Sequence, residues 1–320
     1  MGFEKVLVTG GAGRLGRYVV AELTGHCRVT TLDRAGGPSP PDLAPDLAPD
    51  LPPDLPVDIL DLEPLTRALR GQDALIHLAA IDASVPAPPE MIFDTNVRGT
   101  WNVLQAAHQA GVRKAVVCSS VAAAGIDATN RHLPPLYLPI DEAHPLRPSH
   151  EYGLSKQLDE CIAESFARRG GMQVICLRPA WVMFPGVLRD VLGQLSEAGP
   201  PARAPDAADR PDRLREPLPL LRSYVDPQDL ARAFRLALEL DSPRYEVFFV
   251  VAADTFHPTP TLPYLEHAYG SLPEIRKPEI YAGNPRASAH DITRARELLG
   301  WRPTTTWPQV AARGAALAAG

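Results

Sequence analysis

The sequence predicts an α/β fold with a mostly parallel sheet covered by helices on both faces, and three observations support that class. Over the first 180 residues, short runs rich in aliphatic and β-branched residues alternate with longer helical stretches. Runs such as Val6-Leu7-Val8 are apolar without interruption, which is typical of strands buried on both faces. The composition, 45% apolar and 22% charged, allows a full hydrophobic core. Strands joined by helices of this length predict βαβ crossovers.

Each expected element has a local signal. The strands are the β-rich apolar runs, and in chain order they are Val6–Thr9, Arg28–Leu32, Val57–Leu60, Ala74–Leu78, Ala115–Cys118, Val174–Leu177 and Glu246–Val251. The helices are longer stretches with helical apolar spacing, and in chain order they are Leu15–Leu23, Leu62–Leu69, Met91–Ala110, Glu151–Arg168, Leu188–Leu195, Gln228–Leu240 and Thr293–Leu299. The last helix is closed by Gly300.

The alternation ends near residue 180, which divides the chain into two expected parts. Residues 1–180 form the sheet domain, and residues 181–320 form a smaller C-terminal lobe, with 226–251 returning to the sheet. Residues 185–227 and 256–290 have loop character, because proline breaks helices and central strands.

Charge and cysteine usage exclude several classes of function. The formal net charge of −6 argues against binding to nucleic acid or an anionic membrane, because both need a basic face. No apolar run approaches the roughly 18 residues of a membrane span, and the first strand begins too early for a signal peptide. The four cysteines and nine histidines show no ligand spacing. We therefore expect a cytoplasmic protein without a metal site.

The first strand ends in a glycine-rich turn, Thr9-Gly10-Gly11-Ala12-Gly13-Arg14-Leu15-Gly16. Gly10, Gly13 and Gly16 have the spacing of a dinucleotide-binding turn. The first permits a tight turn, the second lets backbone N–H groups approach a pyrophosphate, and the third lets the helix pack on the strand. The helix N-terminus then faces the negative charge. The alternative is an ordinary turn between a strand and a helix.

The end of the second strand indicates which dinucleotide binds. Asp33 lies 17 residues beyond Gly16, where a carboxylate can bind both ribose hydroxyls and repel a 2′-phosphate. This favours NAD over NADP, although Arg14 or Arg34 would favour NADP if either reached that phosphate.

Proline is over-represented, because 35 of 320 residues, about 11%, is roughly twice the usual share. A proline-rich insertion at 38–56 repeats Pro-Asp-Leu four times after residue 40. We expect a polyproline-like surface loop there. The alternative is an acidic flap beside the adenine of a nucleotide.

A tyrosine and a lysine four residues apart, Tyr152 and Lys156, lie on one face of an expected helix. The strand upstream of them ends in Ser119-Ser120. A free tyrosine is a poor base at neutral pH, and a nearby ammonium stabilises its phenolate. This combination predicts proton transfer by Tyr152. Taken singly, Tyr152 also fits a surface tyrosine, Lys156 a solvated helix face and Ser120 a loop cap.

Over nearly its whole length the sequence resembles the extended short-chain dehydrogenase/reductase family, the NAD-dependent epimerase/dehydratase group, which has a Rossmann-type doubly wound parallel sheet. The glycine turn and Tyr152–Lys156 are the specific motifs. The supporting motifs are Asp58-Ile59-Leu60-Asp61, His77-Leu78-Ala79-Ala80, Asn96-Val97-Arg98-Gly99-Thr100, Ser119-Ser120, Arg178-Pro179 and Leu299-Gly300-Trp301-Arg302-Pro303.

The resemblance implies a role for each matching residue. Tyr152 is the acid/base, Lys156 binds the nicotinamide ribose, and Ser120 hydrogen-bonds the reacting oxygen. Asp58 and Ile59 hold the adenine. The cofactor contacts expected in all are Gly10, Gly13, Arg14, Leu15, Gly16, Asp33, Arg34, Asp58, Ile59, Leu78, Ala79, Ala80, Asn96, Tyr152, Lys156 and Pro179.

Departures from the family pattern bear on the substrate. Val121 and Ala122 stand where sugar dehydratases have an Asp-Glu pair and decarboxylating members a Glu, which disfavours both reactions. Trp181 replaces the usual asparagine, and Tyr281 stands near the place of a diphosphate-binding arginine, whereas Arg222 matches a family arginine. We therefore expect a free sugar, sugar acid or similar hydroxy compound, with Ser120, Trp181, Arg222 and Tyr281 as candidate substrate contacts.

The sequence favours an NAD-dependent oxidoreductase that moves hydride to or from a hydroxyl-bearing carbon. Two alternatives remain open: a nucleotide-sugar 4-epimerase with tightly bound NAD, and an NAD-sensing binding protein without catalysis. The resemblance also implies a possible homodimer through the helices at 91–110 and 151–168.

Overall fold

The computed structural model describes residues 2–34, 53–126, 133–197, 219–241, 244–256 and 258–319. Most of the proline-rich insertion, residues 38–52, lies outside these ranges, so both interpretations of it stay predictions. Within the described ranges, no helix combines the length and the apolar character needed to cross a bilayer.

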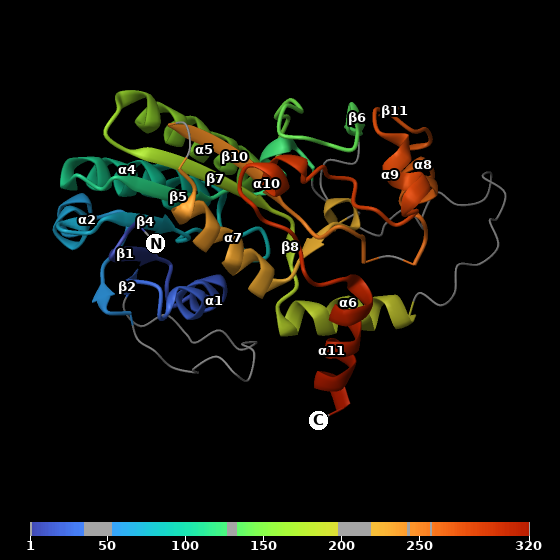
Figure 1. Cartoon of the computed structure of the whole chain (residues 1–320), viewed down its shortest axis with the longest axis horizontal. Coiled ribbons are helices and arrows are strands. Elements are labelled where there is room, and N and C mark those ends of the chain that lie inside the picture. The colour runs from blue at the N-terminus through green and yellow to red at the C-terminus, as the bar shows by residue number, and fades with distance from the viewer. Residues whose placement is uncertain are drawn as a thin grey trace.

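A seven-stranded sheet forms the centre of the molecule, with the strand order β10-β7-β5-β4-β1-β2-β3 (Figure 1). Every neighbouring pair in it is parallel. The strands are β1 (Lys5–Thr9), β2 (Arg28–Asp33), β3 (Leu55–Pro56), β4 (Ala74–His77), β5 (Lys114–Cys118), β7 (Gln173–Pro179) and β10 (Tyr245–Val250). The predicted α/β fold with a doubly wound parallel sheet is confirmed.

Helices cover both faces of the sheet because successive strand residues point to opposite sides. The covering helices are α1 (Arg14–Leu23), α2 (Leu62–Leu69), α4 (Gly99–Ala110), α5 (Glu151–Arg169) and α7 (Pro227–Glu239). Val6 and Val8 pack into a core with α1 and α7. Leu7, between them, packs into a second core with α2, α4 and α5. The uninterrupted apolar strand is thus buried from both sides.

The strand order of the described sheet contains a reversal of winding, and we call the region outside the strand ends at that reversal the crevice. The chain leaves β1 toward β2 on one side and later returns to β4 on the other, so the direction of winding reverses between β1 and β4. In open parallel sheets, ligands bind at such a reversal, outside the carboxyl ends of the strands. The loops after β1, β4 and β5 and the first turn of α5 meet there, and these segments carry the predicted site.

Two predicted boundaries in the sheet region were wrong. Residues 57–60, expected as a strand, form a turn, and β3 is only Leu55–Pro56. The Asp58 side chain accepts a hydrogen bond from the Leu60 amide at 2.9 Å, and such a local contact favours a turn over a strand. The long helix expected at 91–110 is divided into α3 (Pro89–Ile92), a π-helical segment η1 (Phe93–Arg98) and α4.

The C-terminal lobe contains more regular structure than its proline content suggested. Its elements are β8 (Trp181–Val182), α6 (Pro185–Glu197), a 3-10 turn η4 (Pro219–Arg222), β9 (Tyr224–Val225), α8 (Thr261–Tyr269), β11 (Glu274–Ile275), α9 (Pro278–Gly283), α10 (Thr293–Glu297) and α11 (Trp307–Ala319). An earlier strand, β6 (Tyr137–Leu138), pairs with β11. In Figure 1, α8, α9, β6 and β11 lie together on the right, on the side of the molecule opposite α2 and β2, and α11 lies beside α6.

The loop prediction for residues 256–290 was therefore wrong, and α11 was not predicted. Several prolines occupy the first turn of a helix, as Pro89 in α3, Pro227 in α7 and Pro278 in α9 do. A proline is tolerated there because the amide it lacks has no partner inside the helix. The division of the chain at residue 180 stays a prediction, although α7 and β10 belong to the sheet layer.

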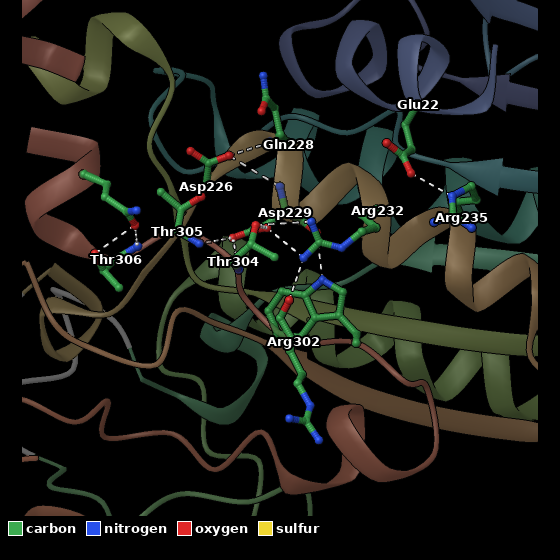
Figure 2. A network of polar contacts seen from close by, with 12 residues as sticks. Glu22, Asp226, Gln228, Asp229, Arg232, Arg235, Arg302, Thr304, Thr305 and Thr306 are labelled. Atoms are coloured by element: carbon green, nitrogen blue, oxygen red, sulfur yellow. Dashed lines mark hydrogen bonds and ion pairs between the residues drawn. The ribbon is translucent and has the colours of Figure 1, made fainter. Parts of the chain in front are cut away.

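A buried carboxylate attaches the C-terminal segment to α7 (Figure 2). Asp229 is 2% exposed. Its side chain accepts hydrogen bonds from the amides of Thr304 and Thr305 at 2.9 and 3.1 Å and from the Thr304 hydroxyl at 2.6 Å. Its backbone carbonyl accepts one from the Trp301 indole at 2.8 Å. The motif at Leu299–Pro303 thus leads the chain back onto the sheet layer.

We predict that Asp229→Ala lowers the free energy of unfolding by about 3 kcal/mol, because the partly buried amides of Thr304 and Thr305 and the Arg232 guanidinium lose their acceptor. Urea unfolding followed by circular dichroism measures this. The control is Glu63→Ala, which removes an exposed ion pair with Arg67 in α2 and should change stability by about 0.5 kcal/mol or less. Equal effects of the two substitutions would contradict this role for Asp229.

Candidate active site

The glycine turn between β1 and α1 is held by two close approaches of backbone. Gly10 has φ 72°, and a Cβ there would lie 2.7 Å from the Ala79 amide nitrogen. A Cβ on Gly16 would lie 2.1 Å from the Gly10 carbonyl oxygen. Neither position accepts a side chain without moving backbone, so these two glycines bring α1 against the carboxyl ends of β1 and β4.

Gly13 differs from the other two. A Cβ there would meet only the Gly10 carbonyl oxygen, at 3.2 Å. Gly13 caps α1 without a side-chain hydrogen bond to the first turn, so no side chain competes for the N–H groups there. The N–H groups at a helix N-terminus favour an anionic group. The turn therefore fits the pyrophosphate of a dinucleotide.

Asp33 and Arg34 lie at the opposite edge of this turn. Asp33, half-buried at the end of β2, accepts a hydrogen bond from the Ala12 amide at 3.2 Å through Oδ2 and from the Arg34 amide at 2.8 Å through Oδ1. Its carboxylate thus faces the glycine turn, whereas Arg34 is exposed. Arg14 instead makes an ion pair with Asp82, in the loop after β4. Because β4 and β2 flank β1 on opposite sides, Arg14 is directed away from Asp33.

The turn at Asp58 and Ile59 is fixed onto α4. Ile59 is 5% exposed, and a Cβ on Gly99 would lie 2.5 Å from its Cδ1 atom. The Asn102 side chain donates hydrogen bonds to the carbonyls of Ile59 and Leu60 at 3.2 and 3.1 Å. Asn102 was not predicted, although it lies three residues beyond Gly99, on the same side of α4.

The segment after β4 is anchored by the π-helical turn. The Leu78 amide donates to the Thr9 carbonyl at 3.1 Å, and Ala79 and Ala80 continue along the crevice with increasing exposure. Asn96, fully buried in η1, accepts from the Ile81 amide at 2.8 Å and donates to the Ile81 carbonyl at 3.0 Å. The same amide group donates to the Ser155 hydroxyl at 3.0 Å. Asn96 thus connects this segment with α5, as a supporting residue behind the site.

His77, at the end of β4, is a second connection that the sequence did not identify. Its ring nitrogens are hydrogen-bonded to the hydroxyls of Thr9 at 2.7 Å and Thr100 at 2.9 Å. Burial, with the charge of Lys156 as a smaller cause, lowers the pKa of His77 to about 3. The ring is therefore neutral and acts as a bridge between β1, β4 and α4.

Lys156 brings α5 to the end of β5. Its ammonium donates to the Cys118 carbonyl at 3.0 Å and to the Asp159 carboxylate at 3.1 Å. The Lys156 nitrogen lies 6.0 Å from the centre of the Tyr152 ring. Burial disfavours the charge of Lys156, but Asp159 and Tyr152 outweigh it and raise its pKa. Burial raises the pKa of Asp159 to about 6, against the effect of Lys156.

Tyr152 and Ser120 meet beside this lysine. Burial raises the pKa of Tyr152 to about 12, while the Lys156 charge and a hydrogen bond with Ser120 act in the opposite direction. Ser120 caps the 3-10 turn η2 (Val121–Ala124), where its hydroxyl accepts from the Ala122 amide at 3.1 Å. A Cβ on Gly153 would lie 2.8 Å from the Ala122 carbonyl oxygen, so the glycine lets α5 approach η2 closely.

The candidate substrate residues divide into two groups. Arg222 is buried, with its guanidinium 5.3 Å from the centre of the Phe256 ring, and its Nε donates to the Tyr264 hydroxyl at 3.0 Å. Trp181 is half-buried and packs edge-on against Phe256 at 5.9 Å. Arg222 and Trp181 therefore both lie against the Phe256 ring.

Tyr281, by contrast, is only 5% exposed. Its hydroxyl donates to the Ser288 carbonyl at 3.4 Å within the core of the C-terminal lobe. Its position is accounted for by packing, so Tyr281 is not carried into the proposal below.

Pro179, expected as a cofactor contact, ends β7 and pairs with Val250. Leu15, the second residue of α1, packs against the core that α1 shares with α7. Asp159 and Asp82 were not predicted. The position of Asp159 three residues after Lys156 on the same helix could have indicated their ion pair. No spacing in the sequence indicates the pair of Asp82 with Arg14.

Comparisons with known proteins agree with this geometry. The model of the NAD dependent epimerase/dehydratase family matches residues 6–250. A UDP-glucose 4-epimerase of Lactobacillus helveticus is 29% identical over 331 residues, which cover 93% of this chain and 92% of the relative. An L-arabinose 1-dehydrogenase (NAD(P)(+)) of Haloferax volcanii is 29% identical over 202 residues, 59% of this chain and 72% of the relative.

A solved structure is similar over almost the full length. It is a short-chain dehydrogenase/reductase superfamily protein from Agrobacterium tumefaciens with bound NAD. The TM-score is 0.69 at 25% identity, with 99% of this chain and 97% of that chain covered.

The glycine geometry predicts opposite effects for two substitutions. Gly13→Ala should leave the free energy of unfolding within about 1 kcal/mol of wild type but weaken NAD binding at least about tenfold, because the new methyl faces the anion site. Gly16→Ala should destabilise the protein, because its Cβ meets backbone. Thermal unfolding and calorimetric titration with NAD measure both. Retained NAD affinity in Gly13→Ala would place the pyrophosphate elsewhere.

Proposed function

This chain belongs to the NAD-dependent epimerase/dehydratase family, and from that membership we propose that it is an NAD-dependent dehydrogenase. Its substrate would be a free sugar, a sugar acid or a similar small hydroxy compound. The observation that carries the proposal is the meeting of Tyr152, Lys156 and Ser120 at the carboxyl end of β5, on the same edge of the sheet as the glycine turn after β1.

In this proposal each of the three side chains has one role. NAD, when bound, supplies the hydride acceptor. Tyr152 removes the proton of the substrate hydroxyl through its phenolate oxygen, or returns it in the reverse direction. Lys156 stabilises that phenolate by its charge, and the Asp159 carboxylate and the Cys118 carbonyl hold the ammonium in place. Ser120 hydrogen-bonds the reacting oxygen and orients it toward Tyr152.

The cofactor contacts are proposed along the crevice. Gly13 and the first turn of α1 hold the pyrophosphate, Asp33 holds the adenine ribose, and the turn at Asp58 and Ile59 borders the adenine. NAD is favoured over NADP because the Asp33 carboxylate would repel a 2′-phosphate. The ion pair of Arg14 with Asp82 supports the same preference, since it directs this cation away from Asp33.

A small substrate is favoured by the residues beyond the reacting centre. Val121 and Ala122 are both buried, and neither carries the carboxylate that sugar dehydration or decarboxylation would use. Arg222 is proposed to bind a carboxylate or hydroxyls of the substrate beside Trp181. The L-arabinose 1-dehydrogenase relative shows that a similar chain acts on a free sugar.

The second candidate is a nucleotide-sugar 4-epimerase that retains its NAD. It is favoured by the UDP-glucose 4-epimerase of Lactobacillus helveticus, which matches 93% of this chain. A non-catalytic NAD-sensing protein is the least supported alternative, because such a protein has no need of a buried lysine beside Tyr152.

We also propose a homodimer through the outer face of α3, η1, α4 and α5. Four large apolar side chains are exposed there: Met91, Phe93, Trp101 and Leu154. Exposed apolar groups gathered on one face indicate an interaction surface. Because such a face is self-complementary under a two-fold axis, a second copy of the chain is the proposed occupant.

The acid/base role predicts that Tyr152→Phe lowers turnover by about 10³-fold while NAD affinity stays within about twofold of wild type. Because the phenolate is the base, the wild-type rate of oxidation should rise with pH toward the pKa of Tyr152, and this limb should be absent in the variant. A dehydrogenase assay over a pH series, with a panel of free and UDP-linked sugars, measures the turnover and its pH dependence. Tyr137→Phe, which removes a hydroxyl bonded to Asp141, is the control. Unchanged turnover in Tyr152→Phe would rule out the mechanism.

The dimer proposal predicts that the double substitution Met91→Glu and Leu154→Glu yields a monomer, whereas wild type is a dimer at micromolar concentration. Light scattering after gel filtration measures the mass. Leu298→Glu is a matched control, because Leu298 is exposed to 51% in another part of the fold. A monomeric wild type, or equal dissociation in the control, would argue against this face.

A further inference from the structure

An ion pair crosses the crevice between the two loops that border it. Arg14, the first residue of α1, lies after β1, and Asp82 lies in the loop after β4. The Arg14 Nη2 atom is 3.0 Å from the Asp82 carboxylate and 3.4 Å from the Ser84 hydroxyl. Because β1 and β4 flank the reversal of winding, the pair spans the place where the fold is expected to bind a dinucleotide.

Neighbouring residues hold both Asp82 and Arg14 in position. The Asp82 carboxylate accepts a hydrogen bond from the Ser84 amide at 2.6 Å, and the preceding residue, Ile81, is bonded on both sides to Asn96. The Arg14 guanidinium lies 5.0 Å from the centre of the Phe184 ring, which belongs to the segment after β7. Asp82 therefore presents a fixed negative charge to an arginine beside the N-terminus of α1.

The pair is placed so that an incoming anion can displace it. The side chains of Arg14 and Asp82 are 26% and 47% exposed, and ion pairs with this exposure contribute little to stability. A pyrophosphate carries two negative charges and also gains the N–H groups of α1, so it is the stronger partner for Arg14.

We infer that Asp82 is an internal anion that competes with the cofactor pyrophosphate for Arg14 and so weakens cofactor binding. The consequence is a cofactor that exchanges between turnovers. A dehydrogenase needs this exchange, whereas an epimerase that retains its NAD does not. The inference rests on the proposed dinucleotide site and adds Asp82 to the residues that determine cofactor affinity.

NADH is the probe for the test, because its nicotinamide ring is uncharged and the pyrophosphate then dominates the electrostatic response. Its dissociation constant and dissociation rate are measured by fluorescence titration and stopped flow on the full chain. Asp82→Asn should bind NADH about fivefold more tightly and release it more slowly. Arg14→Gln should bind it about tenfold more weakly. In the Arg14→Gln background, Asp82→Asn should change the NADH dissociation constant by less than about twofold, because the arginine for which Asp82 competes is absent.

The matched control is Glu22→Gln, which removes an ion pair of 2.7 Å between Arg235 and the last turn of the same helix. It should leave NADH affinity unchanged. Weaker binding or faster dissociation of NADH in Asp82→Asn would show that the ion pair helps to retain the cofactor. An unchanged dissociation constant would show that Asp82 does not compete for Arg14. Either result overturns the inference about Asp82 but leaves the proposed cofactor site in place. A wild-type protein that binds neither NADH nor NADPH would overturn the cofactor assignment as well.

Discussion

The buried charge of Lys156 is the constraint on which the arrangement of the site depends. Lys156 is 5% exposed, and a buried ammonium is stable only with close partners, which Asp159 and the Cys118 carbonyl provide. Because Cys118 ends β5 and Asp159 lies one turn further along α5, satisfying the lysine fixes the helix against the end of the strand. Tyr152, one turn earlier, is thereby placed beside Ser120.

The same region is reinforced by a second buried pair. The Glu160 carboxylate accepts two hydrogen bonds from Arg178 of β7, at 2.8 and 2.7 Å, and one from the Ser119 hydroxyl at 2.6 Å. Glu160 thus binds α5 to the ends of two neighbouring strands, β5 and β7, and its neighbour Asp159 binds Lys156. This explains how α5 can hold reactive groups steady at the edge of the sheet while the substrate side of the crevice differs from the family pattern.

The sheet and the cofactor side could be predicted from the sequence because their signals are local. Apolar strands such as Val6–Thr9 are short continuous apolar runs, and the three glycines of the turn lie within one short segment from Gly10 to Gly16. The lobe was harder, because proline at a helix start and proline in a loop look the same in composition, as Pro278 of α9 shows. Asp82 was missed because its partner Arg14 lies 68 residues away and no spacing connects them.

The measurement that tests the account most directly is the amount of reduced cofactor formed per protein molecule. Purified protein is mixed with excess NAD and a panel of free sugars and sugar acids, and the absorbance of reduced nicotinamide is followed. We predict many equivalents of free NADH with at least one of these substrates. At most one equivalent, remaining bound through gel filtration, together with interconversion of a UDP-linked sugar, would contradict the dehydrogenase and identify an epimerase.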